Sequence, residues 1–214
     1  MSGQAAVGGA SKRALDLAIT VPAALLLTPV LIAVGMWIRR DSPGPALFLQ
    51  KRVGLFGRPF RLVKFRTMVV GAERMGPGLA IDEGDSRITA AGARLRRLSL
   101  DELPQLWNVI RGDMSLVGPR PTVASQVALY TPEQRRRLLA RPGLTGLAQV
   151  SGRASIPWSR RIELDIDYVE RWSMRRDLVI LARTLLVVLR RGGTYKGTTG
   201  GFDLAPDGEG GGDR

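Results

Sequence analysis

The stretch LAITVPAALLLTPVLIAVGMWI, residues 17–38, contains no charged side chain. A helix needs about 20 consecutive apolar residues to cross the hydrocarbon core of a bilayer. The stretch is longer than the apolar core of a signal peptide, which has roughly 7–15 residues. It therefore predicts a membrane helix over residues 12–40, with a buried helix of a soluble protein as the alternative.

Basic residues flank this stretch on both sides, Lys12 and Arg13 before it and Arg39 and Arg40 after it. Lys and Arg collect on the cytoplasmic side of membrane proteins. A helix that spans the bilayer carries one of these pairs across, whereas a helix that enters and returns to the same face keeps both pairs in the cytoplasm. The flanks favour a re-entrant helix over a kinked span, and the sequence leaves both open.

Two prolines, Pro22 and Pro29, interrupt the apolar stretch, and Thr28 precedes the second. An internal proline removes one backbone hydrogen bond and kinks a helix. We expect the helix to break near Thr28 and Pro29, with the Thr28 hydroxyl bonded to a carbonyl that the kink frees inside the lipid.

The composition narrows the chemistry of the remaining chain. The 214 residues include no Cys and no His, which excludes disulfides, thiolate metal sites and imidazole-based catalysis. The formal net charge is +13, and most of the positive residues are Arg. One Arg guanidinium can bind two phosphate oxygens at once, and basic chains also bind anionic membranes or nucleic acid. A phosphate-containing ligand, a membrane and a nucleic acid therefore all remain possible partners at this point.

The rest of the chain predicts a mainly helical α+β domain over residues 41–196. Residues 1–11 and the Gly-rich, acidic tail 197–214 are expected to be disordered. Residues 75–85 indicate a surface loop, and Thr131 with Pro132 and Glu133 indicates a helix start. Strands are expected at residues 46–50 and 60–65, and helices at 87–98, 103–110, 161–171 and 178–190, the last either interfacial or in the core.

Adjacent carboxylates occur within the segment SLDELPQLWN, residues 99–108. Ser99 and Glu102 have the spacing of a capping box, which would make the acids structural. The functional interpretation gives Asp101 the role of nucleophile at phosphorus and Glu102 that of a Mg²⁺ ligand. Three arginines precede the pair and would neutralise an anionic substrate: Arg94, Arg96 and Arg97.

Two further segments are rich in turn residues. Pro119 and Pro121 fix the backbone on either side of Arg120, which is either a solvated side chain in a rigid turn or a phosphate clamp. Residues 141–153 form either an ordinary loop or a nucleotide-binding loop whose backbone approaches the ligand closely.

These motifs and their order resemble the bacterial sugar transferase family, the monotopic phosphoglycosyl transferases, in its small form with only the catalytic unit. The similarity extends over residues 12–192. The matching motifs are residues 12–16 (KRALD), 28–29 (TP), 64–68 (KFRTM), 99–106 (SLDELPQL), 108–121, 141–146 (RPGLTG), 149–153 (QVSGR), 163–165 (ELD) and 168–169 (YV).

The resemblance implies transfer of a sugar-1-phosphate from a UDP-sugar to polyprenyl phosphate, with release of UMP. It implies that Asp101 is the covalent nucleophile and that Glu102, with Asp101 beside it, handles Mg²⁺. It implies phosphate-binding roles for three residues and nucleotide-sugar contacts for two: Arg96, Arg120 and Lys64, then Gln149 and Arg153.

The resemblance also implies a place and partners for the protein. A re-entrant helix broken at Thr28 and Pro29 would hold the catalytic domain on the cytoplasmic face of the bacterial inner membrane, among membrane lipid. The rivals are a glycosyltransferase that moves the sugar alone and a non-enzymatic basic membrane-anchored binding module. No nucleic-acid partner is expected, because basic and aromatic residues do not alternate. A homodimer is compatible with the sequence, which does not select the sugar.

Overall fold

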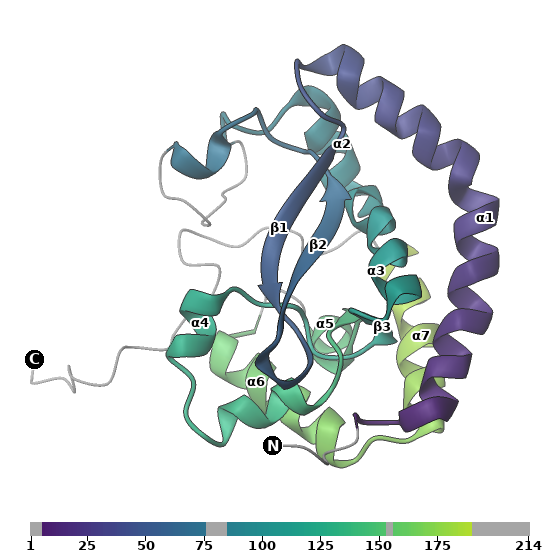
Figure 1. Cartoon of the computed structure of the whole chain (residues 1–214), viewed down its shortest axis with the longest axis vertical. Coiled ribbons are helices and arrows are strands. Elements are labelled where there is room, and N and C mark those ends of the chain that lie inside the picture. The colour runs from purple at the N-terminus through teal and green to yellow at the C-terminus, as the bar shows by residue number, and fades with distance from the viewer. Residues whose placement is uncertain (1–5, 76–84, 153–155, 190–214) are drawn as a thin grey trace, which may run out of the picture.

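The computed structural model describes residues 6–75, 85–152 and 156–189. Most of them are helical, with two small sheets, so the predicted mainly helical α+β class is confirmed (Figure 1). Disorder was expected at residues 1–11 and 197–214. Residues 1–5 and 197–214 lie outside the described residues, as do residues 76–84 of the expected loop, whereas residues 9–11 are helical. The helices are α1 Gly9–Asp41, α2 Ala90–Arg97, α3 Leu106–Arg111, α4 Ala124–Ala128, α5 Leu147–Ser151, α6 Trp158–Glu170 and α7 Met174–Leu189.

The long apolar helix is α1, which begins at Gly9, three residues before the predicted start. It is continuous through Pro22 and Pro29, so the expected break at Thr28 and Pro29 is wrong; α1 instead curves along one edge of the molecule (Figure 1). The Thr28 hydroxyl donates to Ala24 O at 2.8 Å. That carbonyl is not the one Pro29 leaves without its usual partner, because the helical acceptor for residue 29 is residue 25.

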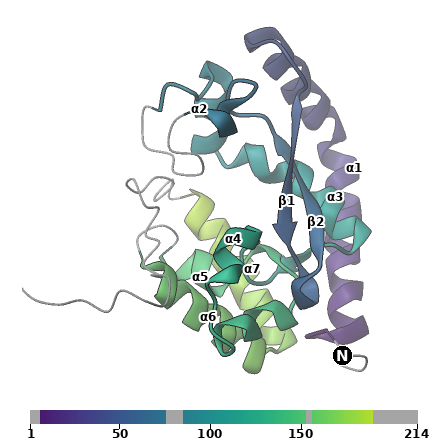
Figure 2. The ribbon, with the colours of Figure 1, turned by 60° about the vertical axis from the view of Figure 1, so that its left-hand side comes forward.

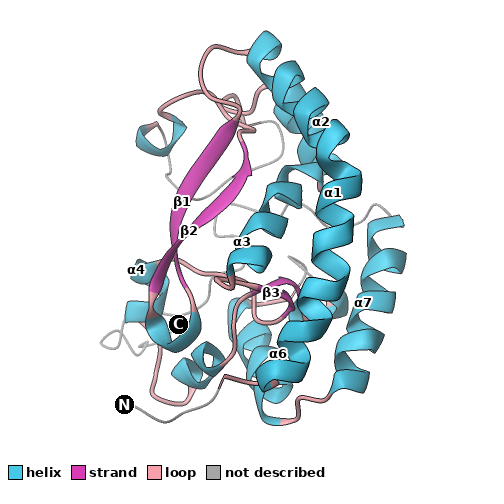
Figure 3. Ribbon diagram, turned by 45° about the vertical axis from the view of Figure 1, so that its right-hand side comes forward, coloured by secondary structure: helices cyan, strands magenta, loops and turns pink. Residues whose placement is uncertain are grey.

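The N-terminal end of α1 is bonded to the rest of the molecule beside α3 and α7 (Figure 3). Lys12 is buried and its Nζ lies 2.6 Å from Asp177 Oδ2 on α7. One turn later, buried Asp16 accepts hydrogen bonds from the Ser115 hydroxyl and the Leu116 N–H, each at 3.0 Å. The sequence predicted that Lys12 lies at the membrane surface as a basic flank of the helix. This is wrong, because Lys12 is buried and Asp177 neutralises its charge inside the protein.

The C-terminal end of α1 packs on the same domain. Val34 and Ile38 lie in an apolar cluster with Phe65 and Leu95, and the Asp41 carboxylate accepts from the Ala91 N–H at 3.1 Å. The middle of α1 makes few contacts: the large apolar side chains Leu25, Leu26 and Ile32 are 71%, 80% and 57% exposed. The helix therefore touches the domain at both ends and presents an apolar surface between them.

A β-hairpin forms the centre of the domain, and both of its strands were predicted. β1 (Leu47–Val53) pairs antiparallel with β2 (Pro59–Phe65) across a turn in which Gly57 has a φ of +77°. The hairpin runs from the end that holds α2 to the end that holds α4 and α6 (Figures 1 and 2). Because side chains alternate along a strand, Arg52 and Lys64 share one face with buried Leu62, while Phe65 packs from the other face.

A second sheet was not predicted. β3 (Ser115–Val117) and β4 (Gly143–Thr145) are parallel, three residues long and largely buried. The sequence predicts turns in both segments, because Gly and Pro flank each of the two strands. Leu116 and Val117 join the main apolar core, with Val109, Met114, Tyr168 and Ile180.

The predicted helices are present with shifted bounds. The segment expected to be one helix over residues 103–110 is a 3-10 helix, η3 (Leu100–Gln105), followed by α3. Thr131 and Gln134 exchange backbone-to-side-chain hydrogen bonds before the 3-10 helix η4 (Gln134–Leu139), which confirms the predicted helix start. Along α7, Asp177 and Ile180 are buried, whereas four apolar side chains are exposed: Leu178, Val179, Leu185 and Leu186.

Candidate active site

A cavity of about 540 Å³, called the large cavity below, lies between the inner face of the hairpin, η3, β4, α6 and α7. The predicted residues Asp101, Glu102, Arg96, Arg120, Lys64 and Gln149 all line it. Arg153 lies outside the described residues. Segments from 64 to 149 in the sequence therefore meet at one site, as an enzyme site would require.

Asp101 and Glu102 lie in the first turn of η3. Ser99, directly before this helix, has a φ of +55°, a backbone conformation that non-glycine residues rarely adopt, and its side chain makes no capping hydrogen bond. The capping-box interpretation is therefore wrong. The strained turn at Ser99 instead directs both carboxylates toward the large cavity.

Cations surround the two carboxylates. Arg120 Nη2 donates to Glu102 Oε1 at 2.8 Å, and Arg96 is held by its Nε on the Thr67 hydroxyl at 3.0 Å. Lys64 enters from β2. Of the three arginines before the pair, only Arg96 lines the large cavity; Arg94 and Arg97 are exposed, and Arg94 lies over the ring of Trp37 on α1.

The charges in the large cavity shift one another's protonation. Burial, together with the neighbouring Glu102 carboxylate, raises the pKa of Asp101 to about 6, against the opposing effect of Lys64 and Arg96. Burial and Arg52 lower the pKa of Lys64 to about 8. Asp101 is thus mostly ionised at neutral pH, and it is more basic than an ordinary aspartate, which favours nucleophilic attack.

Arg52 is a site residue that the sequence interpretation missed. It lines the large cavity from β1, and burial together with the Arg120 charge lowers its pKa to about 10. Its Nη2 donates to Gln50 Oε1 at 2.7 Å. The strand predicted at residues 46–50 ended before Arg52, and the observed strand continues beyond it. Extending the alternation of that strand by two residues would have placed Arg52 on the same face as Lys64.

Within the described part of the chain, some polar atoms of residues that line the large cavity are buried without a hydrogen bond. Gln149 lines it, and both polar atoms of its amide are buried without a hydrogen-bond partner in the structure. Asp165 also lines it, is 1% exposed, and leaves Oδ1 without such a partner while Oδ2 accepts from Arg137. Buried polar groups are normally paired, so these atoms are available to a ligand with hydroxyl or amide groups.

The structure explains why glycine occupies positions 143 and 146. A Cβ atom on Gly143 or Gly146 would collide with the backbone of Gly118, and one on Gly118 would collide with the Arg141 carbonyl. The two segments therefore cross backbone to backbone. This crossing of two parts of the chain accounts for the glycines. Nucleotide binding by the loop that carries these glycines stays a prediction, and its residues that line the large cavity include Leu144 and Thr145.

The carboxylates also limit how a metal could bind. Within the described parts of the chain, no group of three or more acidic side chains is placed to hold a metal ion. Mg²⁺ commonly takes one or two carboxylates and completes its shell with water and substrate phosphates. The adjacent Asp101 and Glu102 fit a Mg²⁺ site with two carboxylates, in which water and substrate phosphates supply the other ligands.

Comparison with known proteins agrees with this geometry. A family model described as bacterial sugar transferase matches residues 7–191. The chain belongs to the bacterial sugar transferase family. The matched range includes α1 as well as the whole large cavity, so the apolar helix is part of the family's common unit.

Individual members of the bacterial sugar transferase family are closely similar. The UDP-glucose:undecaprenyl-phosphate glucose-1-phosphate transferase of Caulobacter vibrioides is 46% identical over 193 residues, covering 86% of this chain and 72% of the relative. The exopolysaccharide production protein ExoY of Sinorhizobium fredii is 39% identical and is covered to 90%. The undecaprenyl-phosphate galactose phosphotransferase of Salmonella typhimurium is also 39% identical, but this chain spans only 41% of it.

Proposed function

We propose that this protein transfers a sugar-1-phosphate from a UDP-sugar to polyprenyl (undecaprenyl) phosphate and releases UMP, the first membrane step in assembling a polysaccharide or other glycoconjugate. The names of its relatives in Caulobacter and Salmonella support this reaction class. The observation that carries the proposal is the charge balance of the site, since six cationic side chains and three carboxylates of the described residues line the large cavity. The cations whose charges act on Asp101 or Glu102 include Arg52, Lys64, Arg96 and Arg120. Excess positive charge suits an anionic diphosphate.

The first step forms a covalent intermediate on Asp101. A carboxylate oxygen of Asp101 attacks the β-phosphorus of the UDP-sugar, and the bond from that phosphorus to the bridging oxygen breaks, so that UMP leaves with the bridging oxygen. Arg96 and Lys64 lie close enough to affect the charge of Asp101, and they would neutralise the phosphoryl oxygens. Because no His or Cys exists in the chain, Asp101 is the best-placed nucleophile.

The second step regenerates the enzyme. A phosphate oxygen of the lipid attacks the same phosphorus, the acyl phosphate bond to Asp101 breaks, and the product is a polyprenyl diphosphate sugar. Arg120, fixed on Glu102, would hold the phosphoryl oxygens through both steps. Glu102 with Asp101 would hold Mg²⁺, which when bound supplies positive charge to the diphosphate.

The placement of α1 supports a re-entrant helix at the cytoplasmic face of the bacterial inner membrane, where UDP-sugars are present. Lys12 and Asp16 bind the domain at one end of α1, and Ile38 and Asp41 bind it at the other. Both ends bind the same domain, so a span that placed one end on the opposite face of the bilayer would break the contacts of that end. The exposed apolar residues between them, with those of α7, would enter the lipid.

The main rival enzyme activity is transfer of the sugar alone. The nucleotide product distinguishes the two, because sugar-phosphate transfer releases UMP and sugar transfer releases UDP. We expect UMP when the purified protein in lipid nanodiscs is given Mg²⁺, undecaprenyl phosphate and a panel of UDP-sugars, and no UMP from Asp101→Asn. UDP as the nucleotide product would reject the proposed reaction. If the protein turns over no UDP-sugar of the panel and binds nucleic acid or lipid tightly, the non-enzymatic binding module would be favoured.

A further inference from the structure

The segment that carries Arg120 is fixed in an unusual way. Prolines at positions 119 and 121 have no N–H, so the segment is held mainly through its carbonyl groups. Each of three successive carbonyls accepts a hydrogen bond from a different part of the chain: Pro119 O from Gly143 N at 2.9 Å, Arg120 O from Arg137 Nη2 at 3.0 Å, and Pro121 O from Arg52 Nη1 at 3.4 Å. Two of these three donors are guanidinium groups.

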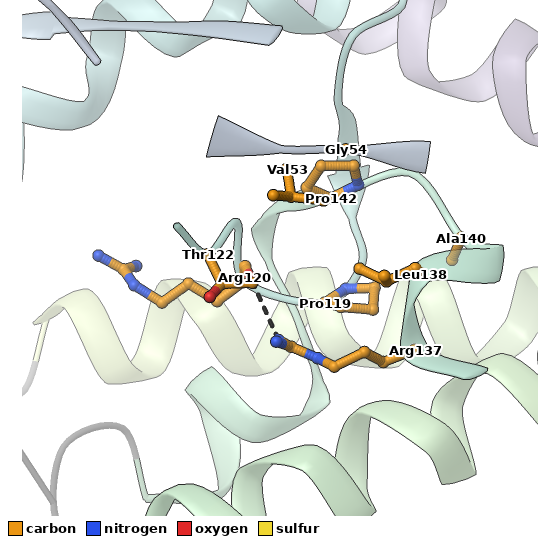
Figure 4. Close-up of a pocket in the computed structure, with 9 residues that line it drawn as sticks. All are labelled: Val53, Gly54, Pro119, Arg120, Thr122, Arg137, Leu138, Ala140 and Pro142. Carbon is orange, nitrogen blue, oxygen red and sulfur yellow. Dashed lines mark hydrogen bonds between the residues drawn. The ribbon is translucent and has the colours of Figure 1, made fainter. Parts of the chain in front are cut away.

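Arg137, on η4, is the donor to Arg120 itself, and Figure 4 shows its side chain reaching the Arg120 main chain while the Arg120 guanidinium points away. Arg137 is 2% exposed. Its Nε and Nη2 donate to Asp165 Oδ2 at 3.1 and 2.5 Å, and its Nη1 donates to the Tyr130 hydroxyl at 2.6 Å. The planar fork of the guanidinium therefore joins three partners at once.

Stability alone is a weak reason for such an arrangement. Burying an ion pair costs desolvation energy that its attraction often fails to recover, and apolar residues of similar size frequently do as well. What an apolar residue could not do is donate to the Arg120 carbonyl. Arg137 donates to the main chain of Arg120, and the Nη2 of the same Arg120 lies 2.8 Å from Glu102 Oε1.

We propose that Arg137 is a positioning residue for Arg120: held by Asp165 and Tyr130, it fixes the Arg120 main chain so that the guanidinium meets Glu102 and the substrate phosphate. This inference rests on the proposed function, in which Arg120 binds that phosphate. Arg137 also lines the large cavity, but its guanidinium is bonded to Asp165, Tyr130 and the Arg120 carbonyl. The positioning role therefore predicts that Arg137 acts through Arg120 and not by touching the substrate. Lys at position 137 keeps the charge but cannot reach all three partners, so it does not replace Arg.

A double-mutant cycle tests this. We expect Arg137→Lys to lower kcat/KM for the UDP-sugar about tenfold in the wild-type background and by less than about twofold in Arg120→Ala, because coupled residues give non-additive effects. The affinity for UDP, measured by calorimetry, should follow the same pattern. Arg136→Met is the matched control: it lies on the same 3-10 helix, half exposed, and pairs with Glu170 at the surface.

Equal losses in both backgrounds would overturn the positioning role, since a general structural defect acts whether or not Arg120 is present. If Arg137 variants fail to fold, Tyr130→Phe removes one acceptor and keeps the ring. Its smaller loss should likewise disappear in Arg120→Ala, and a loss that persists there would overturn the proposal. The two ideas fail separately: coupled UDP affinities without UMP formation would reject the proposed reaction only, and UMP formation with additive losses would reject the positioning role only.

Discussion

Replacing Asp101 by Asn is expected to stabilise the protein while it abolishes turnover. The pKa of Asp101 is about 6 in the folded chain, because burial and Glu102 disfavour its charge, and about 3.8 is ordinary for an exposed aspartate. At pH 7.5 the carboxylate is ionised in both the folded and unfolded states, so the folded state bears the cost of holding a disfavoured charge. Asn is similar in size and carries no charge, so it removes that cost.

The magnitude follows from linkage. A tenfold change in an acid constant corresponds to about 1.4 kcal/mol, which gives an upper limit of about 3 kcal/mol for the gain at pH 7.5. As the pH falls through 6, the folded form takes up a proton before the unfolded form does, so the gain decreases to about half at pH 5 and vanishes near pH 3. For a chain of this length, 3 kcal/mol raises Tm by roughly 6–12 °C.

The assay is thermal unfolding of wild type and Asp101→Asn in nanodiscs, without Mg²⁺ or nucleotide, at pH 7.5 and pH 5. Asp113→Asn is the control, because Asp113 pairs with Arg111 near the surface and accepts a hydrogen bond from Asn108, so that its loss gives no stabilisation. A Tm for Asp101→Asn that is equal to or below that of wild type at pH 7.5, or a gain that does not decrease at pH 5, would refute the reasoning.

Three other predictions use different parts of the molecule. The pH profile of kcat/KM should be bell-shaped, falling near pH 8 as Lys64 loses its proton and rising at or below pH 6 as Asp101 ionises, because Mg²⁺ beside Asp101 would favour its ionised form; a flat profile between pH 5 and 9 would contradict these roles. Lys12→Met leaves the Asp177 carboxylate buried without its cation, so denaturant unfolding should show a loss of about 3–5 kcal/mol, partly recovered when Asp177→Leu is added; additive losses would contradict this. Gly143→Ala should lower Tm and protein yield because its Cβ meets backbone rather than a mobile side chain, and an unchanged Tm would show that the two segments can separate.

Local patterns were sufficient to predict several parts of the fold. The uncharged stretch at residues 17–38 gives the long helix, and alternating residues on either side of a Gly-containing turn give the hairpin. The resemblance that rests on the order of the motifs also predicts one shared site for Lys64, Arg96, Asp101 and Arg120. All four line the same cavity.

Features that depend on long-range contacts were not predictable in the same way. Lys12 reads as a flank of a membrane helix, and only its contact with Asp177, 165 residues later, makes it a buried ion-pair partner. Three-residue strands such as β3 are too short to show a period, so Gly118 and Gly143 read as turn residues although they mark a crossing of two backbones. Arg137 lies in a run of three arginines, and nothing local separates it from exposed Arg136.

The central claim is that Asp101 carries the sugar phosphate as a covalent intermediate, and intact-mass spectrometry tests it most directly. Protein in nanodiscs is mixed with Mg²⁺ and a UDP-sugar that supports turnover, without undecaprenyl phosphate, and quenched in acid. We predict a mass increase of one sugar phosphate on the wild type, its loss when undecaprenyl phosphate is added, and no increase on Asp101→Asn. A wild-type protein that forms product but never carries the added mass, or an Asp101→Asn variant that does carry it, would contradict the account.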